Sequence, residues 1–176
     1  MTVLIQLFHP RLSESRVNRA WVEAARAAGY RVRDLYGLYA DGAIEVAAEQ
    51  EACESAEAIV FQHPMHWYGG PWLMKRWIDE VLKHGWAYGG RYALEGKRWL
   101  EAVAIGGREE EYAAGRFREY TAEEFLRPLE RTAAFCRMQW EAPFLQFASG
   151  YLPPEDIEAS AEAYVDRLRL LRIEDR

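Results

Sequence analysis

The chain has 176 residues, half of them hydrophobic and 14% aromatic. This excludes an intrinsically disordered chain, because enough apolar groups are present to offset the entropy lost on ordering. A formal net charge of −6 excludes a nucleic-acid binder, whose phosphate contacts need clustered Lys and Arg. No apolar stretch approaches the roughly 20 residues that cross a bilayer. Cys53 and Cys136 form no spacing motif, so we expect a cytoplasmic protein.

Strand and helix patterns alternate along the chain. Strands are expected over residues 3–8, 31–35, 58–62, 98–105 and 139–147, which are apolar runs rich in strand formers. Helices are expected over residues 16–28 and 46–54, from Pro71 to about residue 82, after Thr121, and from Pro154 to about residue 171. Loops are expected over residues 36–44 and 85–96. The pattern predicts a single α/β domain over residues 1–176, with a five-stranded parallel sheet and helices on both faces.

Ligands bind such a sheet beyond the carboxyl ends of its strands. Three segments directly follow strands and therefore fall at that edge: residues 9–18, 64–70 and 106–112. Each is a weak signal alone, and their common position is what makes them a candidate site.

The first segment holds Ser15, Arg16 and Asn18 at the predicted start of the first helix. Hydroxyl, guanidinium and amide donors beside free backbone N–H groups form an anion site at the positive end of a helix. The spacing is neither a P-loop nor GxGxxG, which argues against a triphosphate or a Rossmann dinucleotide. A hydroxyl-rich loop suits a flavin monophosphate. The alternative is that Ser13 or Ser15 only caps the helix.

The second segment places Trp67 and Tyr68 between a buried strand and a helix begun by Pro71. A flat aromatic face and exposed peptide amides suit an isoalloxazine ring. The alternative, in a chain with seven Trp, is that Trp67 is a core or interface aromatic. His63 and His66 lack a third ligand at suitable spacing, so no metal is expected.

The third segment begins with Gly106-Gly107, which allows the backbone to approach a ligand closely. A plain tight turn explains the pair equally well. Tyr112 would donate a hydrogen bond during hydride transfer or would simply pack, and residues 109–111 are expected to be a solvated acidic face.

At these segments the sequence resembles the flavodoxin-like NAD(P)H:quinone oxidoreductases, especially the bacterial branch that includes ancillary proteins of glutathione-gated potassium-efflux systems. The resemblance extends over nearly the whole chain in one register. Its main segments are His9-Pro10, Ser15 to Arg19, Asp34-Leu-Tyr-Gly-Leu-Tyr39, Ile59-Val-Phe-Gln-His-Pro-Met-His-Trp-Tyr68, Trp77-Ile-Asp79, His84-Gly-Trp-Ala-Tyr-Gly89, Gly106-Gly107 and Pro143-Phe144.

The resemblance implies a flavodoxin-like, FMN-binding domain with a ping-pong cycle. NADH or NADPH leaves a hydride on FMN N5 and departs, and a quinone-type acceptor then occupies the same pocket. The implied phosphate ligands are His9, Ser15, Arg16, Val17 and Asn18. The implied flavin-ring contacts are Met65, His66, Trp67, Tyr68, Ala104, Ile105, Gly106 and Gly107.

The resemblance also implies a homodimer with the flavin site at the subunit interface. The loop from Trp86 to Tyr92 independently favours a dimer, because it holds three aromatic residues that a monomer would partly expose.

The sequence departs from the family pattern at two site loops. The family's Thr-Thr-Gly-Gly is here Ala104-Ile-Gly-Gly107, which removes two hydroxyls and leaves the backbone amides. Tyr112 matches a Tyr that assists hydride transfer in the mammalian enzymes and is the expected catalytic residue, whereas Gly115-Arg116 stands near the position of the assisting His. Glycines replace the Ser often found after the Trp-Tyr pair.

Two other roles compete with a quinone oxidoreductase. One is a regulatory subunit docked on a potassium-efflux antiporter, peripheral at the inner membrane, in which flavin or nucleotide binding matters more than turnover. The other is a flavodoxin-type electron carrier, which the modest acidity of 28 Asp and Glu against 22 Lys and Arg disfavours.

Overall fold

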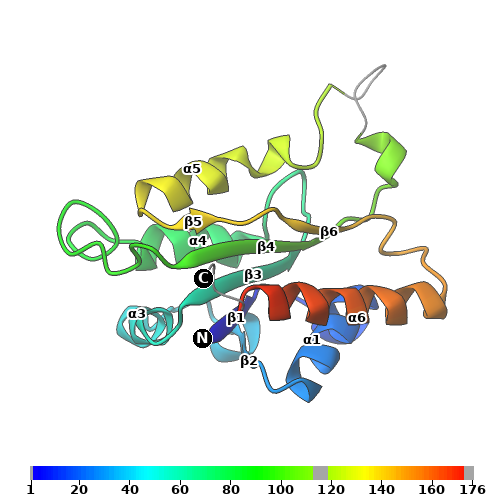
Figure 1. Cartoon of the computed structure of the whole chain (residues 1–176), viewed down its shortest axis with the longest axis horizontal. Coiled ribbons are helices and arrows are strands. Elements are labelled where there is room, and N and C mark those ends of the chain that lie inside the picture. The colour runs from blue at the N-terminus through cyan, green and yellow to red at the C-terminus, as the bar shows by residue number, and fades with distance from the viewer. Residues whose placement is uncertain (1, 113–118, 173–176) are drawn as a thin grey trace.

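The computed structural model describes residues 2–112 and 119–172, and its centre is a parallel β-sheet (Figure 1). The strands run in the order β2-β1-β3-β4-β5, with β6 also paired to β4, and every pairing is parallel. Their bounds are Val3–Leu7 (β1), Arg31–Asp34 (β2), Ala58–Pro64 (β3), Arg98–Ala104 (β4), Gln139–Trp140 (β5) and Phe144–Gln146 (β6). The order reverses between β1 and β3, so the topological switch point lies beside these two strands.

The expected fifth strand is divided into β5 and β6, which pair with the two ends of β4. Pro143 lies in the gap between them. The pairing of β5 ends at Trp140, and a proline has no N–H to give to the ladder, so pairing with β4 resumes only at Phe144, with the register shifted by one residue.

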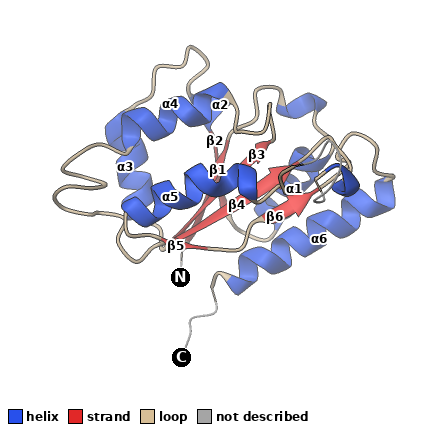
Figure 2. Ribbon diagram, turned by 90° about the horizontal axis from the view of Figure 1, so that it is seen from above, coloured by secondary structure: helices blue, strands red, loops and turns tan. Residues whose placement is uncertain are grey.

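Helices cover both faces of the sheet, as expected. Figure 2 shows α3, α4 and α5 on one side and α1 and α6 on the other. The longer helices are α1 (Val17–Ala27), α3 (Val46–Glu54), α4 (Trp72–Val81), α5 (Arg127–Phe135) and α6 (Pro154–Leu170). The short ones are η1 (Leu12–Glu14), α2 (Leu35–Leu38), η2 (Glu109–Glu111) and η3 (Glu124–Leu126).

Two helix boundaries differ from expectation. The segment expected to be a loop after β2 contains α2, because the Asp34 side chain accepts a hydrogen bond from the Gly37 N–H over 3.1 Å and caps it. The reciprocal Thr121–Glu124 capping bonds are present at 2.7 and 3.3 Å. They begin only the short η3, and α5 starts at Arg127 with Pro128 in its first turn.

The core is built from large aromatic side chains on both faces of the sheet. On the α3–α5 face, Phe61 and Trp99 stack with ring centroids 4.2 Å apart. On the other face, the Trp21 indole of α1 stacks on Tyr164 of α6 and donates a hydrogen bond to Ser160 Oγ over 3.0 Å. Phe61 also meets Trp77 of α4 edge-on at 5.4 Å, and Trp21 meets Phe144 of β6 edge-on at 5.2 Å, so aromatic contacts join a helix to the sheet on each face.

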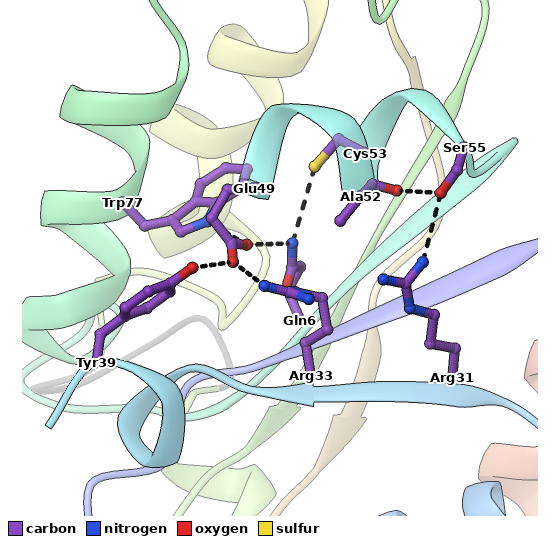
Figure 3. Close-up of polar contacts among 9 residues, drawn as sticks. All are labelled: Gln6, Arg31, Arg33, Tyr39, Glu49, Ala52, Cys53, Ser55 and Trp77. Carbon is purple, nitrogen blue, oxygen red and sulfur yellow. Dashed lines mark hydrogen bonds and ion pairs between the residues drawn. The ribbon is translucent and has the colours of Figure 1, made fainter. Parts of the chain in front are cut away.

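A fully buried carboxylate, Glu49, ties α3 to its neighbours (Figure 3). It accepts hydrogen bonds from Gln6 Nε2 at 3.0 Å, Tyr39 OH at 2.7 Å and Trp77 Nε1 at 3.0 Å, and it forms an ion pair with Arg33. Because every partner comes from a different segment, this one carboxylate connects β1, β2, the loop after α2, and α4.

None of the helices in the described residues is long and apolar enough to cross a membrane.

Candidate functional site

The loops after β1, β3 and β4 meet at one edge of the sheet, toward which the arrowheads of β3, β4 and β6 point in Figure 2. At this edge, the segment after β1, the last residues of β3 and β4, and the loop after β6 line a hollow of about 320 Å³. Its lining residues are His9, Glu14, Ser15, Arg16, Val17, Asn18, Pro64, Ala104, Ser149 and Gly150. The structure thus brings together all five expected phosphate ligands with Ala104. Ser149 and Gly150, from the loop after β6, also line the hollow. They could have been predicted, because the loop after the last strand also lies beyond the carboxyl end of a strand.

The hollow opens beside the N-terminal end of α1. Ser15 Oγ accepts the Asn18 N–H over 3.2 Å, so Ser15 does act as a local cap, as the simpler interpretation holds, and it also lines the hollow. The Arg16 guanidinium is exposed and forms no ion pair within the described part of the chain. An unpaired cation beside a helix start is suited to an anion.

Asn18 is buried at the back of the hollow. Its backbone carbonyl and its Oδ1 accept hydrogen bonds from Gln62 Nε2 at 3.0 and 3.2 Å, and Gln62 Oε1 accepts one from Tyr164 OH at 3.1 Å. This chain connects the site to the core and fixes the Asn18 amide with its oxygen turned toward Gln62.

His9 is held as a neutral donor. Its Nδ1 accepts the Arg11 N–H over 3.1 Å, so the ring hydrogen is on Nε2. Partial burial, with a smaller contribution from His66, lowers the pKa of His9 to about 4, while the Asp34 charge acts in the opposite direction. At neutral pH the site therefore has an N–H donor here without a full charge.

The second loop forms a tight turn whose tip is exposed. His66 and Gly69 exchange two backbone hydrogen bonds of 2.8 and 3.0 Å, and the residues between them, Trp67 and Tyr68, have φ of +48° and +64°. Positive φ at both central positions is typical of a type I′ hairpin turn, which normally uses Asn and Gly. The Trp67 side chain is 94% exposed, so the alternative that it is a core aromatic is wrong.

Met65 and Tyr68 lie against an aromatic cluster that the sequence did not reveal. Tyr68 packs on Phe125 of η3 with ring centroids 4.7 Å apart, and Tyr112 meets Phe125 edge-on at 6.2 Å. The Tyr112 hydroxyl lies 3.8 Å from Met65 Sδ, and burial raises its pKa. Tyr112 therefore packs at the site, and its catalytic role stays a prediction; Gly115-Arg116 lies outside the described residues.

In the third loop the two glycines differ. A Cβ on Gly107 would lie 2.7 Å from Glu111 Oε2 and 3.0 Å from the Tyr112 ring, whereas one on Gly106 would meet open space. A methyl group at position 107 would therefore fit only if the exposed Glu111 carboxylate and the Tyr112 ring shifted. Both glycines line a second hollow of about 530 Å³ with Arg108, Glu111 and Tyr151, and η2 is an exposed acidic turn, as expected.

Ile105 contributes less to the site than expected. Its side chain is fully buried, its N–H donates to the Gln146 carbonyl over 2.8 Å, and its carbonyl accepts from Ser149 over 2.9 Å. The N–H groups of Gly106 and Gly107 have no acceptor among the described residues, so these are the donors available in this loop.

Within the described residues, no three His, Cys, Asp or Glu side chains gather in a group that could hold a metal ion. His63 pairs instead with Glu101, with Nε2 2.7 Å from Oε2.

Comparisons with known proteins agree on the family. The family model described as the flavodoxin-like fold matches residues 1–170. The uncharacterized NAD(P)H oxidoreductase YrkL of Bacillus subtilis is 41% identical over 171 residues, which cover 96% of this chain and 98% of that protein.

Three solved structures share the fold. General stress protein 14 of Treponema denticola in complex with FMN has a TM-score of 0.92 and 37% identity, covering 97% of this chain and 99% of that one. A thermophilic tryptophan halogenase of Streptomycin violaceusniger has a TM-score of 0.90 and 39% identity, covering 94% and 97%. An NADPH-quinone reductase of P. pentosaceus has a TM-score of 0.85 and 26% identity, covering 95% and 97%. The chain therefore belongs to the flavodoxin-like fold family that includes the NAD(P)H oxidoreductase YrkL.

Proposed function

We propose that this chain is an FMN-dependent NAD(P)H:quinone oxidoreductase. The observation that carries the proposal is the meeting of three features at one sheet edge: an anion-binding helix start, an exposed aromatic turn and two glycines with unpaired N–H groups. The NAD(P)H oxidoreductase relative and the FMN complex of a 37% identical protein support the cofactors. The NADPH-quinone reductase among the similar structures supports the acceptor.

The donor set at the first hollow fits a phosphate monoester. His9 Nε2–H, the Ser15 hydroxyl and the Arg16 guanidinium all line it, and the first N–H groups of α1 have no helical acceptor. Positive charge and neutral donors together suit a dianion at a helix start. In this proposal these groups, with Val17 and Asn18, hold the FMN phosphate.

The ring would lie between the aromatic turn and the glycine loop. The Trp67-Tyr68 turn offers an apolar face, and the N–H groups of Gly106 and Gly107 offer donors for ring heteroatoms. The flavin supplies the hydride-accepting N5 when bound. The protein positions the ring, excludes water through the Phe125 cluster and, at Tyr112, holds a phenol at the edge of the site. The two substrates would take turns in one pocket, as a ping-pong cycle requires.

We also propose a homodimer that buries the site edge. Large apolar side chains on elements beside the site are more than half exposed: Leu38 of α2, Trp67, Tyr68 and Trp72 at the start of α4. Exposed apolar surface of this kind marks interaction sites. The loop from Trp86 to Tyr92 gives weaker support, because its aromatics are already half-buried against Glu54, Phe135 and Arg137. Light scattering at micromolar protein should give twice the chain mass.

The decisive experiment is reconstitution with FMN followed by NAD(P)H oxidation with and without a quinone. We expect retained flavin absorbance and quinone-stimulated oxidation, and a Trp67→Ala variant with weaker FMN affinity. If the protein retains FMN but no quinone stimulates its NAD(P)H oxidation, the regulatory role would be favoured. Co-purification with a potassium-efflux antiporter would test that role further. Halogenation of tryptophan without quinone reduction would favour the activity named for the similar halogenase structure.

A further inference from the structure

A chain of buried polar groups runs along one face of β3 and β4 toward the site. Trp99 Nε1 donates to Glu101 Oε1 over 2.6 Å, and Glu101 Oε2 lies 2.7 Å from His63 Nε2. On its other side, His63 Nδ1 lies 3.0 Å from the carbonyl oxygen of Pro64. All three side chains are fully buried.

The acceptors in this chain determine where hydrogens must be. The Pro64 carbonyl can only accept, so His63 Nδ1 carries a hydrogen and donates it. Glu101 Oε1 is occupied by the Trp99 N–H, so the remaining proton lies between His63 Nε2 and Glu101 Oε2. Whether that proton is nearer to nitrogen or to oxygen, the pair has no net charge and the Nδ1–H donor to Pro64 is present.

Apolar side chains could fill the space of this pair in the core. Its neighbours on the same face of the sheet, Phe61 and Val103, are apolar, and replacing a buried ion pair by apolar side chains of similar volume is often neutral or stabilising. The pair contacts the end of β3, because His63 bonds to the carbonyl of Pro64, the last residue of that strand. The Pro64 carbonyl belongs to the Pro64–Met65 peptide, and among the described side chains only His63 holds its oxygen.

The residues after Pro64 are those that need holding. Met65 N–H donates to the Ala104 carbonyl over 2.9 Å, and the turn that follows places Trp67 and Tyr68 at positive φ. A non-glycine residue at positive φ is strained and persists only where its surroundings determine the backbone. Fixing the Pro64 carbonyl orients the peptide that leads into this strained turn.

We propose that His63 is a positioning residue for the flavin-ring loop, acting through its Nδ1–H bond to the Pro64 carbonyl, with Glu101 as the partner that orients its ring. The proposal rests on the proposed function only in that the 65–68 loop is taken to contact the flavin. His63 itself does not contact the cofactor. Its Nδ1 holds the Pro64 carbonyl, and its Nε2 is held by Glu101.

The test compares two substitutions of the same residue. In His63→Asn the side-chain amide takes the place of Nδ1 and can donate to Pro64, whereas in His63→Gln it takes the place of Nε2 and can reach only Glu101. Both lose the imidazole, and His63→Asn also leaves the buried Glu101 Oε2 without its partner, so His63→Asn is expected to be the less stable of the two. Weaker FMN binding by His63→Gln therefore cannot be due to a general loss of stability. We expect FMN to bind His63→Asn within about threefold of the unchanged protein and His63→Gln about tenfold more weakly, the fold-change typical of one hydrogen bond. Equal affinities of the two variants would overturn the proposal.

Glu101→Gln is the control that should fold even where His63 variants do not. Its amide can accept from Trp99 and donate to His63 Nε2, which leaves Nδ1–H directed at Pro64. We expect FMN affinity within about twofold of the unchanged protein, because no bond to the loop is lost. A loss as large as that of His63→Gln would contradict the role of Nδ1.

Two measurements on the FMN-free protein separate this proposal from the proposed function. With only four His in the chain, ¹⁵N-histidine NMR should show His63 Nδ1 protonated in the unchanged protein and in Glu101→Gln. Hydrogen exchange at Met65, His66 and Gly69 should be faster in His63→Gln than in His63→Asn. A bare Nδ1, or equal exchange, would refute the positioning role. Failure of the unchanged protein to bind FMN would refute only the proposed function.

Discussion

The side-chain amide of Gln62 donates to both the backbone carbonyl and the Oδ1 of Asn18, at 3.0 and 3.2 Å. Gln62 is on the central strand β3 and Asn18 is in the first turn of α1. This pair of hydrogen bonds therefore sets the position of the helix start that borders the first hollow. Both side chains are buried. The orientation of the candidate phosphate site is thus determined from the core outward.

Asn18→Ala should destabilise the fold and displace the helix start. It leaves the buried Gln62 Nε2 short of an acceptor, so we expect a loss of about 1–3 kcal/mol in the free energy of unfolding, measured by urea titration. FMN affinity should fall as well. Adding Gln62→Met and Tyr164→Phe together should restore part of the stability, because this removes the unsatisfied amide donor and the hydroxyl that Gln62 Oε1 accepts from, without restoring FMN affinity. Full recovery of both would show that Asn18 has no role at the site.

Glu49→Gln should be among the most destabilising single changes. It removes the charge that faces Arg33 in the buried network, and leaving a buried charge uncompensated costs about 3–5 kcal/mol. Asp79→Asn, which breaks the exposed pair with Lys75 on α4, is the matched control and should cost less than about 1 kcal/mol. Chemical denaturation of both variants measures the difference, and similar losses would contradict the importance of the network.

Stability should depend on pH through His9. Its pKa is about 4 in the folded protein and 6.5 in the reference state, so between these values the unfolded chain binds more protons. The free energy of unfolding therefore decreases as pH falls from about 6.5 to 4. In His9→Gln this contribution is absent, and the fall between pH 7 and pH 5 should be smaller. An anion in the hollow would stabilise protonated His9, so phosphate should reduce the same fall in the unchanged protein but not in the variant.

The adjacent glycines of the third loop give a matched pair. Gly107→Ala places a methyl group against Glu111 and the Tyr112 ring, whereas Gly106→Ala places one in open space. We expect Gly107→Ala to displace Tyr112 and weaken FMN binding about tenfold or more, with a stability loss of about 1–3 kcal/mol typical of overpacking. Gly106→Ala should fold normally. FMN titration and thermal unfolding of both proteins would check this, and equal behaviour would show that Tyr112 moves aside freely.

Trp67→Gly should separate stability from binding. Glycine adopts positive φ without the steric cost that Trp67 bears at +48°, so the free energy of unfolding should stay level or rise despite the loss of a large side chain that is almost fully exposed. FMN affinity should fall. A clear loss of stability would indicate that the indole packs against something in solution, such as a second subunit.

The arrangement of strands and helices could be predicted from the sequence because elements such as Val3–Leu7 and Trp72–Val81 bury a continuous apolar run or stripe. The break between β5 and β6 was missed because one proline outweighed an otherwise strand-like pattern. Phe125 could not be found, because a lone aromatic beside a capping box has no local signal for its contact with Tyr68.

At the site, residue types were predictable and their orientations were not. The sequence placed Ile105 at the site, yet its N–H and its carbonyl are both already hydrogen-bonded, to β6 and to the loop after it. His63, considered as a metal ligand and set aside, proved to be paired with a carboxylate that is distant in sequence. Such pairings depend on the register of β3 against β4, which no local pattern specifies.

The two cysteine thiols are poorly reactive toward oxidants. Burial raises the pKa of Cys53 to about 12 and that of Cys136 to about 11, so at physiological pH almost no thiolate is present, and the thiolate is the species that peroxides and alkylating agents attack. The folded protein should keep two unmodified cysteines in a peroxide-stressed cell. In the proposed function, redox chemistry would therefore take place on a flavin at the sheet edge and not on the sulfur atoms of the chain.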